Sequence, residues 1–233
     1  MIVELLLTSV LIAGAGQLQE PAETARGAVK PAQLLNGAVP QLPVAMLAGG
    51  QVFVELVVDV NGRVAGVKIL RASPPLAALV TGAVASWRFE PSRAMIEAVT
   101  ESVRISVGVP RMSRVFVGAV FRPPSTSSPT LGREPADGDA ADPETPVPIA
   151  VTTPAFPYQA FRGGVVLIEA HVETDGTVSD VCVLESAPPF DAGAIEAAMK
   201  FRFRPAVVNG RAVPSFAYLL FGFPAPITEE LGR

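Results

Sequence analysis

The chain has 233 residues, of which 49% are hydrophobic and 17% are charged, with 23 prolines and 20 glycines. This composition excludes a long coiled coil, a helical bundle and global disorder. A net charge of −4 argues against a nucleic-acid partner, and the single histidine and single cysteine exclude a zinc site of the usual His/Cys type and an intrachain disulfide. We therefore expect no nucleic-acid partner, no metal and no cofactor.

Residues 1–16 are predicted to be a signal peptide or a short N-terminal hydrophobic segment. The apolar stretch from Leu5 to Ile12 precedes Ala13-Gly14-Ala15, which resembles a signal-peptidase cleavage site. This stretch is too short to cross a bilayer, which needs about 20 residues. Glu4 stands where a signal peptide normally carries a positive charge, so an N-terminal core element of a cytoplasmic protein is the alternative. We expect an exported, periplasmic protein.

The sequence contains an internal repeat. Residues 40–109 align with residues 154–223 at a constant offset of 114 and without a gap, and 21 of the 70 aligned positions are identical. Many of these identities are glycines and prolines, which are selected for backbone geometry and therefore mark recurring turns. The chain is thus a tandem duplication, and we expect one domain over residues 22–121 and a second over residues 149–233.

Residues 122–148 separate the two copies. They include seven prolines, and five acidic residues against two basic ones. A segment of this composition buries little apolar surface, so it is predicted to be a flexible, acidic linker.

The second copy shows which elements form the repeated unit. Apolar residues alternate from Val166 to Val172, which predicts a strand with one buried face. Asp175-Gly176 is a hairpin signal, and Val178 to Leu184 reads as the returning strand. A helix is predicted after Asp191, and a third strand over Val213 to Phe223. This order predicts an α+β domain: a three-stranded antiparallel sheet with helices on one face.

The motifs of the second copy occur in the order found in a known family. They are Phe156-Pro157-Tyr158-Gln159-Ala160, Gly164, Asp175-Gly176, Phe201-Arg202-Phe203-Arg204-Pro205 and Asn209-Gly210. This series resembles the C-terminal domain of TonB, over about 70 residues in each copy. The first copy is divergent, because Thr81-Gly82 interrupts its predicted helix and Met95-Ile96 replaces the turn Asn209-Gly210.

The resemblance implies a non-enzymatic role in the cell envelope. Members of the family transmit energy from an inner-membrane motor to outer-membrane transporters, and their last strand, exposed at a sheet edge, pairs with a peptide segment of the receptor. This is β-augmentation, in which backbone groups supply most of the affinity. The partner-binding edge strand predicted here consists of Ser215, Phe216, Ala217, Tyr218, Leu219, Leu220 and Phe221. The expected partner is a receptor segment or another envelope protein of a Gram-negative-type envelope, with the inner-membrane motor as a further candidate.

One alternative is a structural or scaffolding protein whose two sheets pair with each other and engage no receptor. Self-association belongs to the same alternative. The two can be told apart at the edge itself: if Val103–Val109 or an extra strand over Arg114–Phe121 covers Ser215–Phe221, the receptor has no docking site.

Catalytic sites are poorly supported by the sequence. His171 has no second histidine or accompanying nucleophile motif, and Cys182 has no basic cluster near it in sequence. Glu169 and Glu173, with Asp180 across the hairpin, fit an acidic solvated face better than an acid–base pair. The recurring glutamates and arginines of the two copies are expected to form a salt bridge within each copy.

Overall fold

The computed structural model describes residues 29–42, 49–74, 76–99, 104–122, 141–158 and 160–225. In the first copy the elements are β1 (Val29–Lys30), β2 (Gln33–Asn36), β3 (Gly50–Val58), β4 (Val64–Arg71), α1 (Leu76–Val84), β5 (Arg88–Glu90), β6 (Arg93–Val99), β7 (Arg104–Pro110) and β8 (Ser113–Phe121). In the second copy they are β9 (Val147–Ala150), β10 (Gly164–Val172), β11 (Val178–Glu185), α2 (Asp191–Met199), β12 (Arg202–Arg204), β13 (Ala206–Val208), β14 (Arg211–Val213) and β15 (Ser215–Phe223).

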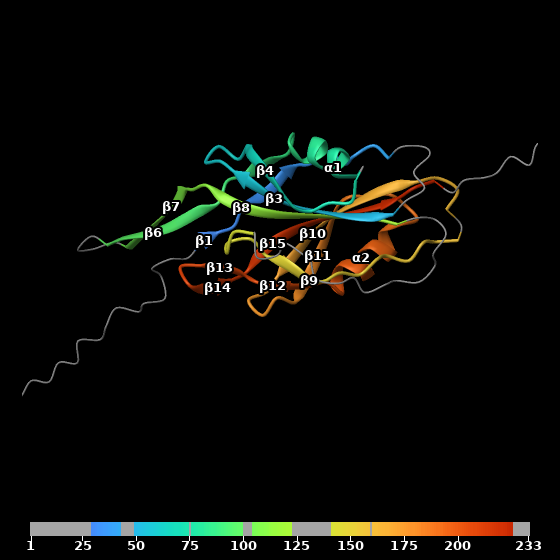
Figure 1. The fold of residues 1–233 in the computed structure, drawn as a ribbon. Coiled ribbons are helices and arrows are strands. Elements are labelled where there is room, and N and C mark those ends of the chain that lie inside the picture. Colours follow the sequence, from blue (N-terminus) through green and yellow to red (C-terminus); the bar gives the residue numbers. More distant parts are fainter. Residues whose placement is uncertain are drawn as a thin grey trace, which may run out of the picture.

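One six-stranded sheet runs through both copies, in the order β11-β10-β15-β8-β3-β4 (Figure 1). Within each copy the three strands are antiparallel. The copies meet at the centre, where β15 and β8 pair in parallel, from Ala217 opposite Phe116 to Gly222 opposite Phe121. A pseudo-two-fold axis that relates two parallel neighbouring strands runs along those strands, and it exchanges the two faces of the sheet.

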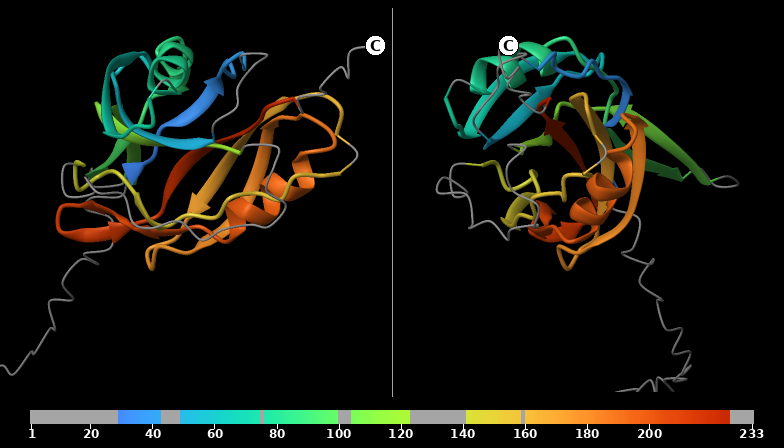
Figure 2. Two further views of the ribbon diagram at one scale, coloured as in Figure 1. Left: turned by 45° about the vertical axis from the view of Figure 1, so that its right-hand side comes forward. Right: turned by 90° about the vertical axis from the view of Figure 1, so that its right-hand side faces the viewer.

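The two helices therefore lie on opposite faces of the sheet, as the views in Figures 1 and 2 agree. In one hydrophobic core α1 packs on the even-numbered residues of β3, and the same core includes the odd-numbered Val165 and Leu167 of β10. In the other core α2 packs on Val166 and Ile168 of β10, and Phe53 of β3 joins it. Successive strand residues point to opposite faces, so this alternation places each copy in both cores.

The recurring glycines form the turns that the repeat predicts. Gly62 and Gly176 have φ values of 76° and 81°, a conformation that L residues with a side chain rarely adopt. Each glycine also lies against the strand that follows the helix: the Phe89 N–H donates to the Gly62 carbonyl, and the Phe203 N–H to the Gly176 carbonyl, both at 2.8 Å. The hairpin of each copy is thus fastened to its β5 or β12 strand in the same way.

The α+β class is confirmed, but the two separate three-stranded sheets are not. Each copy instead contributes three antiparallel strands to one shared sheet. The third strand of the first copy is β8, because Gly50 pairs with Phe121 just as Gly164 pairs with Phe223. The true offset of the third strand is therefore 102 residues, and the ungapped alignment placed it too early.

Part of the predicted linker is packed against the first copy. The Asp142 N–H and the Thr145 hydroxyl both donate to Glu55 Oε2, at 2.7 Å. Thr145 is fully buried, so residues 141–148 do not belong to a flexible tether. The rest of the predicted linker, residues 123–140, and the N-terminal segment 1–16 lie outside the described residues. Among the helices that the structure describes, none is long and apolar enough to cross a membrane.

Candidate protein-binding strands

The strand predicted to bind a partner lies in the interior of the sheet. β15 pairs with β10 along one edge, from Ser215 opposite Val172 to Phe223 opposite Gly164, and with β8 along the other. The expectation that Ser215, Phe216, Ala217, Tyr218, Leu219, Leu220 and Phe221 form an exposed edge is therefore wrong. All of these residues except Phe216 are buried.

The physical reason lies in β8. From Val115 to Phe121 every residue is buried, so this strand needs cover on both faces and a neighbour on each side. β3 supplies one neighbour and β15 supplies the other. The same unpaired edge that would recruit a receptor segment thus pairs with the corresponding strand of the first copy.

Aromatic side chains fasten each copy to the sheet of the other. Phe203, beyond α2, packs edge-on against Phe116 of β8, with ring centroids 5.9 Å apart. Trp87 and Phe89, beyond α1, pack on Tyr218 of β15 at 6.0 and 5.8 Å. All five rings are almost completely buried, and full burial of one such side chain contributes about 1.5–3 kcal/mol.

The repeated glutamates also lie at the contacts between the copies. Glu169 accepts a hydrogen bond of 2.9 Å from the Tyr218 hydroxyl, which in turn accepts one of 2.7 Å from the Leu34 N–H of the first copy. Burial raises the pKa of Tyr218, and the Glu169 carboxylate raises it further, so the phenol stays protonated and donates. Glu55, the equivalent residue, binds Asp142 and Thr145 instead.

The expected salt bridges between the recurring glutamates and arginines are wrong. Arg88 donates to the carbonyls of Ser86 and Trp87, and Arg202 donates to those of Met199 and Phe201. Each arginine thus satisfies carbonyls at or just beyond the C-terminus of the preceding helix, where a positive charge is favourable.

Edges for strand addition do exist elsewhere in the described chain. β4 and β11 end the six-stranded sheet, and β1 and β7 end a three-stranded sheet of order β1-β6-β7. β4 carries Lys68 and Arg71, whereas β11 carries Asp180 and Glu185. Charges on an edge strand discourage pairing with other chains. β7 carries one charged residue, Arg104 at its first position, and none from Ser106 to Val109.

The side chains weighed as catalytic lie along the β10–β11 hairpin, where His171 is opposite Asp180 and Glu169 is opposite Cys182. His171 is half-buried and packs on the ring of Phe216, with centroids 5.3 Å apart, and Cys182 is exposed. Glu173 accepts a hydrogen bond from Ser179. No group of three or more His, Cys, Asp or Glu residues that could hold a metal ion occurs among the described residues.

Comparison with known families agrees with the duplicated fold. A family model described as Gram-negative bacterial TonB protein C-terminal matches residues 40–107 and 153–223. The chain belongs to the TonB C-terminal family. The two matches together cover more than half of its residues and confirm two tandem copies of this domain. No curated protein matches the chain at a significant level.

The first family match ends before β8 begins. The extra strand expected over Arg114–Phe121 is β8, but its equivalence to the third strand of the second copy was missed, because β6 and β7 are longer than β13 and β14 and shift it out of the repeat. A usable signal was present: Ser113–Phe121 and Ser215–Phe223 both combine a serine start with a run of apolar and aromatic residues.

Proposed function

We propose that this chain is a non-enzymatic periplasmic protein that binds other envelope proteins by β-strand addition, in energy transduction to outer-membrane transporters. Membership of the TonB C-terminal family carries the proposal. Unpaired outer strands of the described sheets support it, because they offer rows of backbone N–H and C=O groups.

The occupied edge of β15 changes where a partner segment binds. For a receptor segment to pair with β15, β8 would first have to separate from it. That separation would expose Phe116 and Phe121 of β8, which are at most 2% exposed. The large apolar area uncovered makes this route unfavourable. The outer strands need no such opening, so strand addition at one of them is the route that we propose.

A second candidate function has its own support. The parallel pairing of β8 with β15, and the aromatic contacts across it, fit a scaffold whose two copies use their strand edges on each other. In that case no receptor binds, and the protein serves as a compact spacer or assembly element.

Amide hydrogen exchange separates the two candidates. The purified chain is mixed with a detergent-solubilised outer-membrane fraction, with an inner-membrane fraction as the control, and exchange is followed in β4, β7, β11 and β15. Strand addition is supported if exchange in one outer strand becomes slower with the outer-membrane fraction but not with the inner-membrane fraction. Unchanged exchange in all of the outer strands favours the scaffold.

A further inference from the structure

The hairpin of β6 and β7, here called the arm, is an addition to the first copy. In the second copy the corresponding strands β13 and β14 have three residues each and are joined by the two-residue turn Asn209-Gly210. In the arm each strand has seven residues. Figures 1 and 2 show the arm reaching away from the rest of the molecule.

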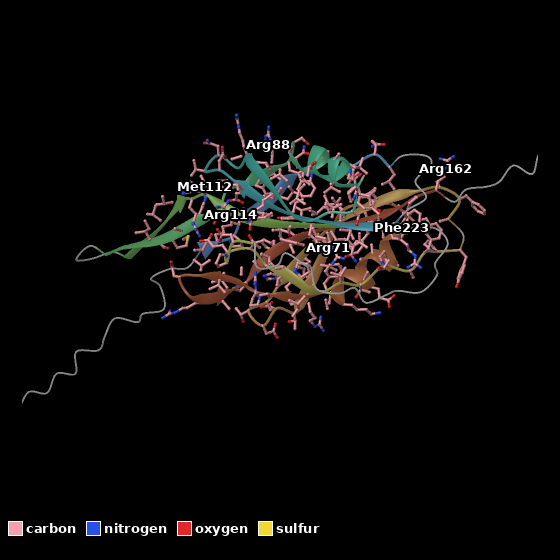
Figure 3. The ribbon with its side chains drawn as sticks, in the orientation of Figure 1. Arg71, Arg88, Met112, Arg114, Arg162 and Phe223 are labelled. Carbon is pink, nitrogen blue, oxygen red and sulfur yellow. The ribbon has the colours of Figure 1, made fainter. Side chains whose placement is uncertain are left out.

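One face of the arm is apolar and exposed. Ala94 pairs with Val109 and Ile96 pairs with Val107, and paired residues share a face of the sheet. Val29 of β1 extends this face, because it pairs with Ala94. Ile96, Val107 and Val109 are 53%, 48% and 43% exposed. Figure 3 shows side chains along the arm, with Met112 and Arg114 labelled at its base.

The outer edge of the arm carries fewer charged residues than the other long edge strands do. In an antiparallel sheet, every second residue of an outer strand points its N–H and C=O away from its neighbour. β4 and β11 each carry two charged residues, whereas β7 carries one, Arg104 at its first position, and Ser106–Val109 carry none. The Arg93 guanidinium donates to the Gly108 carbonyl at 3.1 Å, so the rest of this edge, beside the apolar face, is the part suited to pairing with another strand.

We propose that β7 is the strand-addition site and that its occupant is an extended segment of a partner envelope protein, with apolar side chains at every second position. This inference rests on the proposed function, whose site it specifies. The backbone of the segment pairs with β7, and its apolar side chains extend the face formed by Ile96, Val107 and Val109.

Two other occupants fit the arm less well. A second copy of the chain would meet five side chains of this face among those that the structure describes, whereas a stable interface takes about 20–30 residues from each partner. A lipid bilayer is also unsuitable, because the unpaired N–H and C=O groups of β7 would lose their hydrogen bonds to water inside hydrocarbon. A single extended segment needs less area, because backbone hydrogen bonds supply much of its affinity.

A synthetic peptide tests the site directly. The probe is the acetylated and amidated peptide Glu-Ser-Val-Thr-Ile-Ser-Val-Glu, added to the full chain at millimolar concentration. Its control has the same side chains but N-methylated amides at alternate positions, which removes the donors that strand addition needs. We expect exchange of the Ser106–Val109 amides to slow about tenfold with the probe, and to stay unchanged with the control.

Substitutions on the arm give the matched comparison. Val107→Lys and Val109→Lys place charges on exposed positions of the apolar face and should abolish the protection. Ile69→Lys is the control, because Ile69 of β4 is as exposed as Val107, at 48%. This control variant should leave the protection of the Ser106–Val109 amides unchanged. A third variant replaces residues 96–107 by Asn-Gly, which shortens the arm to the form seen in the second copy. The Gly108 and Val109 amides that it retains should then exchange equally fast with and without the probe.

Other outcomes overturn the proposal in distinguishable ways. Ser106–Val109 amides already protected in the chain alone, together with a doubled mass in light scattering, would assign the arm to a second copy. The outer-membrane fraction could instead protect β4 or β11, while neither the fraction nor the peptide protects β7. That result would overturn the arm as the binding site but keep the proposed function. Protection of β7 by the peptide, with no strand protected by the outer-membrane fraction, would keep the strand-binding site but overturn the proposed function.

Discussion

Phe203 of the second copy packs edge-on against Phe116 of the first, with ring centroids 5.9 Å apart and ring planes at 79°. The mirrored contact joins Phe89 of the first copy to Tyr218 of the second, at 5.8 Å and 71°. Phe89 and Phe203 are repeat equivalents, as are Phe116 and Tyr218 on the central strands. Each copy therefore completes the core of the other, and the two copies form one structural unit.

The two copies should unfold together because of these reciprocal contacts. Phe116→Ala removes a side chain buried in a shared core, and we expect it to destabilise the whole chain by about 3–5 kcal/mol. Trp87 fluorescence reports on the first copy, and a dye on the exposed Cys182 reports on the second. In urea unfolding the two signals should coincide and shift together in the variant. Two separate transitions would show that the copies are independent domains.

The hairpin glycines allow a matched test of backbone geometry against close contact. A Cβ at Gly62 or Gly176 would lie 1.8 Å from the carbonyl oxygen of Phe89 or Phe203, whereas at Gly210 it would meet nothing within 4 Å. All three have positive φ. Gly210→Ala should therefore cost only about 1 kcal/mol, while Gly62→Ala and Gly176→Ala should cost clearly more. Denaturant midpoints compare them, and equal losses at all three positions would contradict the role of the close contact.

Local elements were largely predictable from the sequence. The alternation of Val166–Val172 and the positive φ at Gly176 follow from side-chain period and turn chemistry, which act over a few residues. The pairing of β15 with β8 was foreseen only as an alternative, the cover of Ser215–Phe221 by Arg114–Phe121, and the sequence did not decide in its favour. It depends on strands about 100 residues apart, and the apolar composition of Ser215–Phe223 suits an outer strand covered by a partner as well as a central one.

The prediction made from composition was also wrong for residues 141–148, which precede the second copy. Prolines and acidic residues in 141–148 predict a flexible linker, yet the backbone of Asp142 and the hydroxyl of Thr145 bind the buried Glu55. The deciding feature is a carboxylate about 90 residues earlier in the chain, since a buried charge must find hydrogen-bond donors. No local pattern in the linker itself carries that information.

Two turn carboxylates should make stability fall in acid. Asp59 accepts hydrogen bonds from the N–H groups of Arg63 and Asn61, and these hold its pKa below the usual 3.8. Asp175 accepts from the hydroxyl and the N–H of Thr177, and its pKa is lowered likewise.

The direction of this pH dependence follows from the lowered pKa values of the two carboxyl groups. The folded chain binds these protons less readily than the unfolded chain, so the stabilisation is fully present above about pH 4 and is lost as the pH falls through the lower folded values. NMR titration of the two carboxyl groups should give folded pKa values below those of the unfolded chain, and Asp59→Asn should reduce the acid dependence of unfolding. Ordinary pKa values in the folded chain would contradict the two turn structures.

The Tyr218 hydroxyl links the two copies, because it accepts from the Leu34 N–H and donates to Glu169. Tyr218→Phe removes the partner of a half-buried backbone donor, the Leu34 N–H, and of the half-buried Glu169 carboxylate, and we expect it to lower the free energy of unfolding by about 1 kcal/mol. Tyr158→Phe is the control, because Tyr158 is 90% exposed and should change stability little. Adding Glu169→Gln to Tyr218→Phe should recover part of the loss, since a neutral amide tolerates burial without the phenol better than a carboxylate does. Equal stabilities of the two tyrosine variants in urea unfolding would show that the hydrogen bonds across the copies contribute nothing.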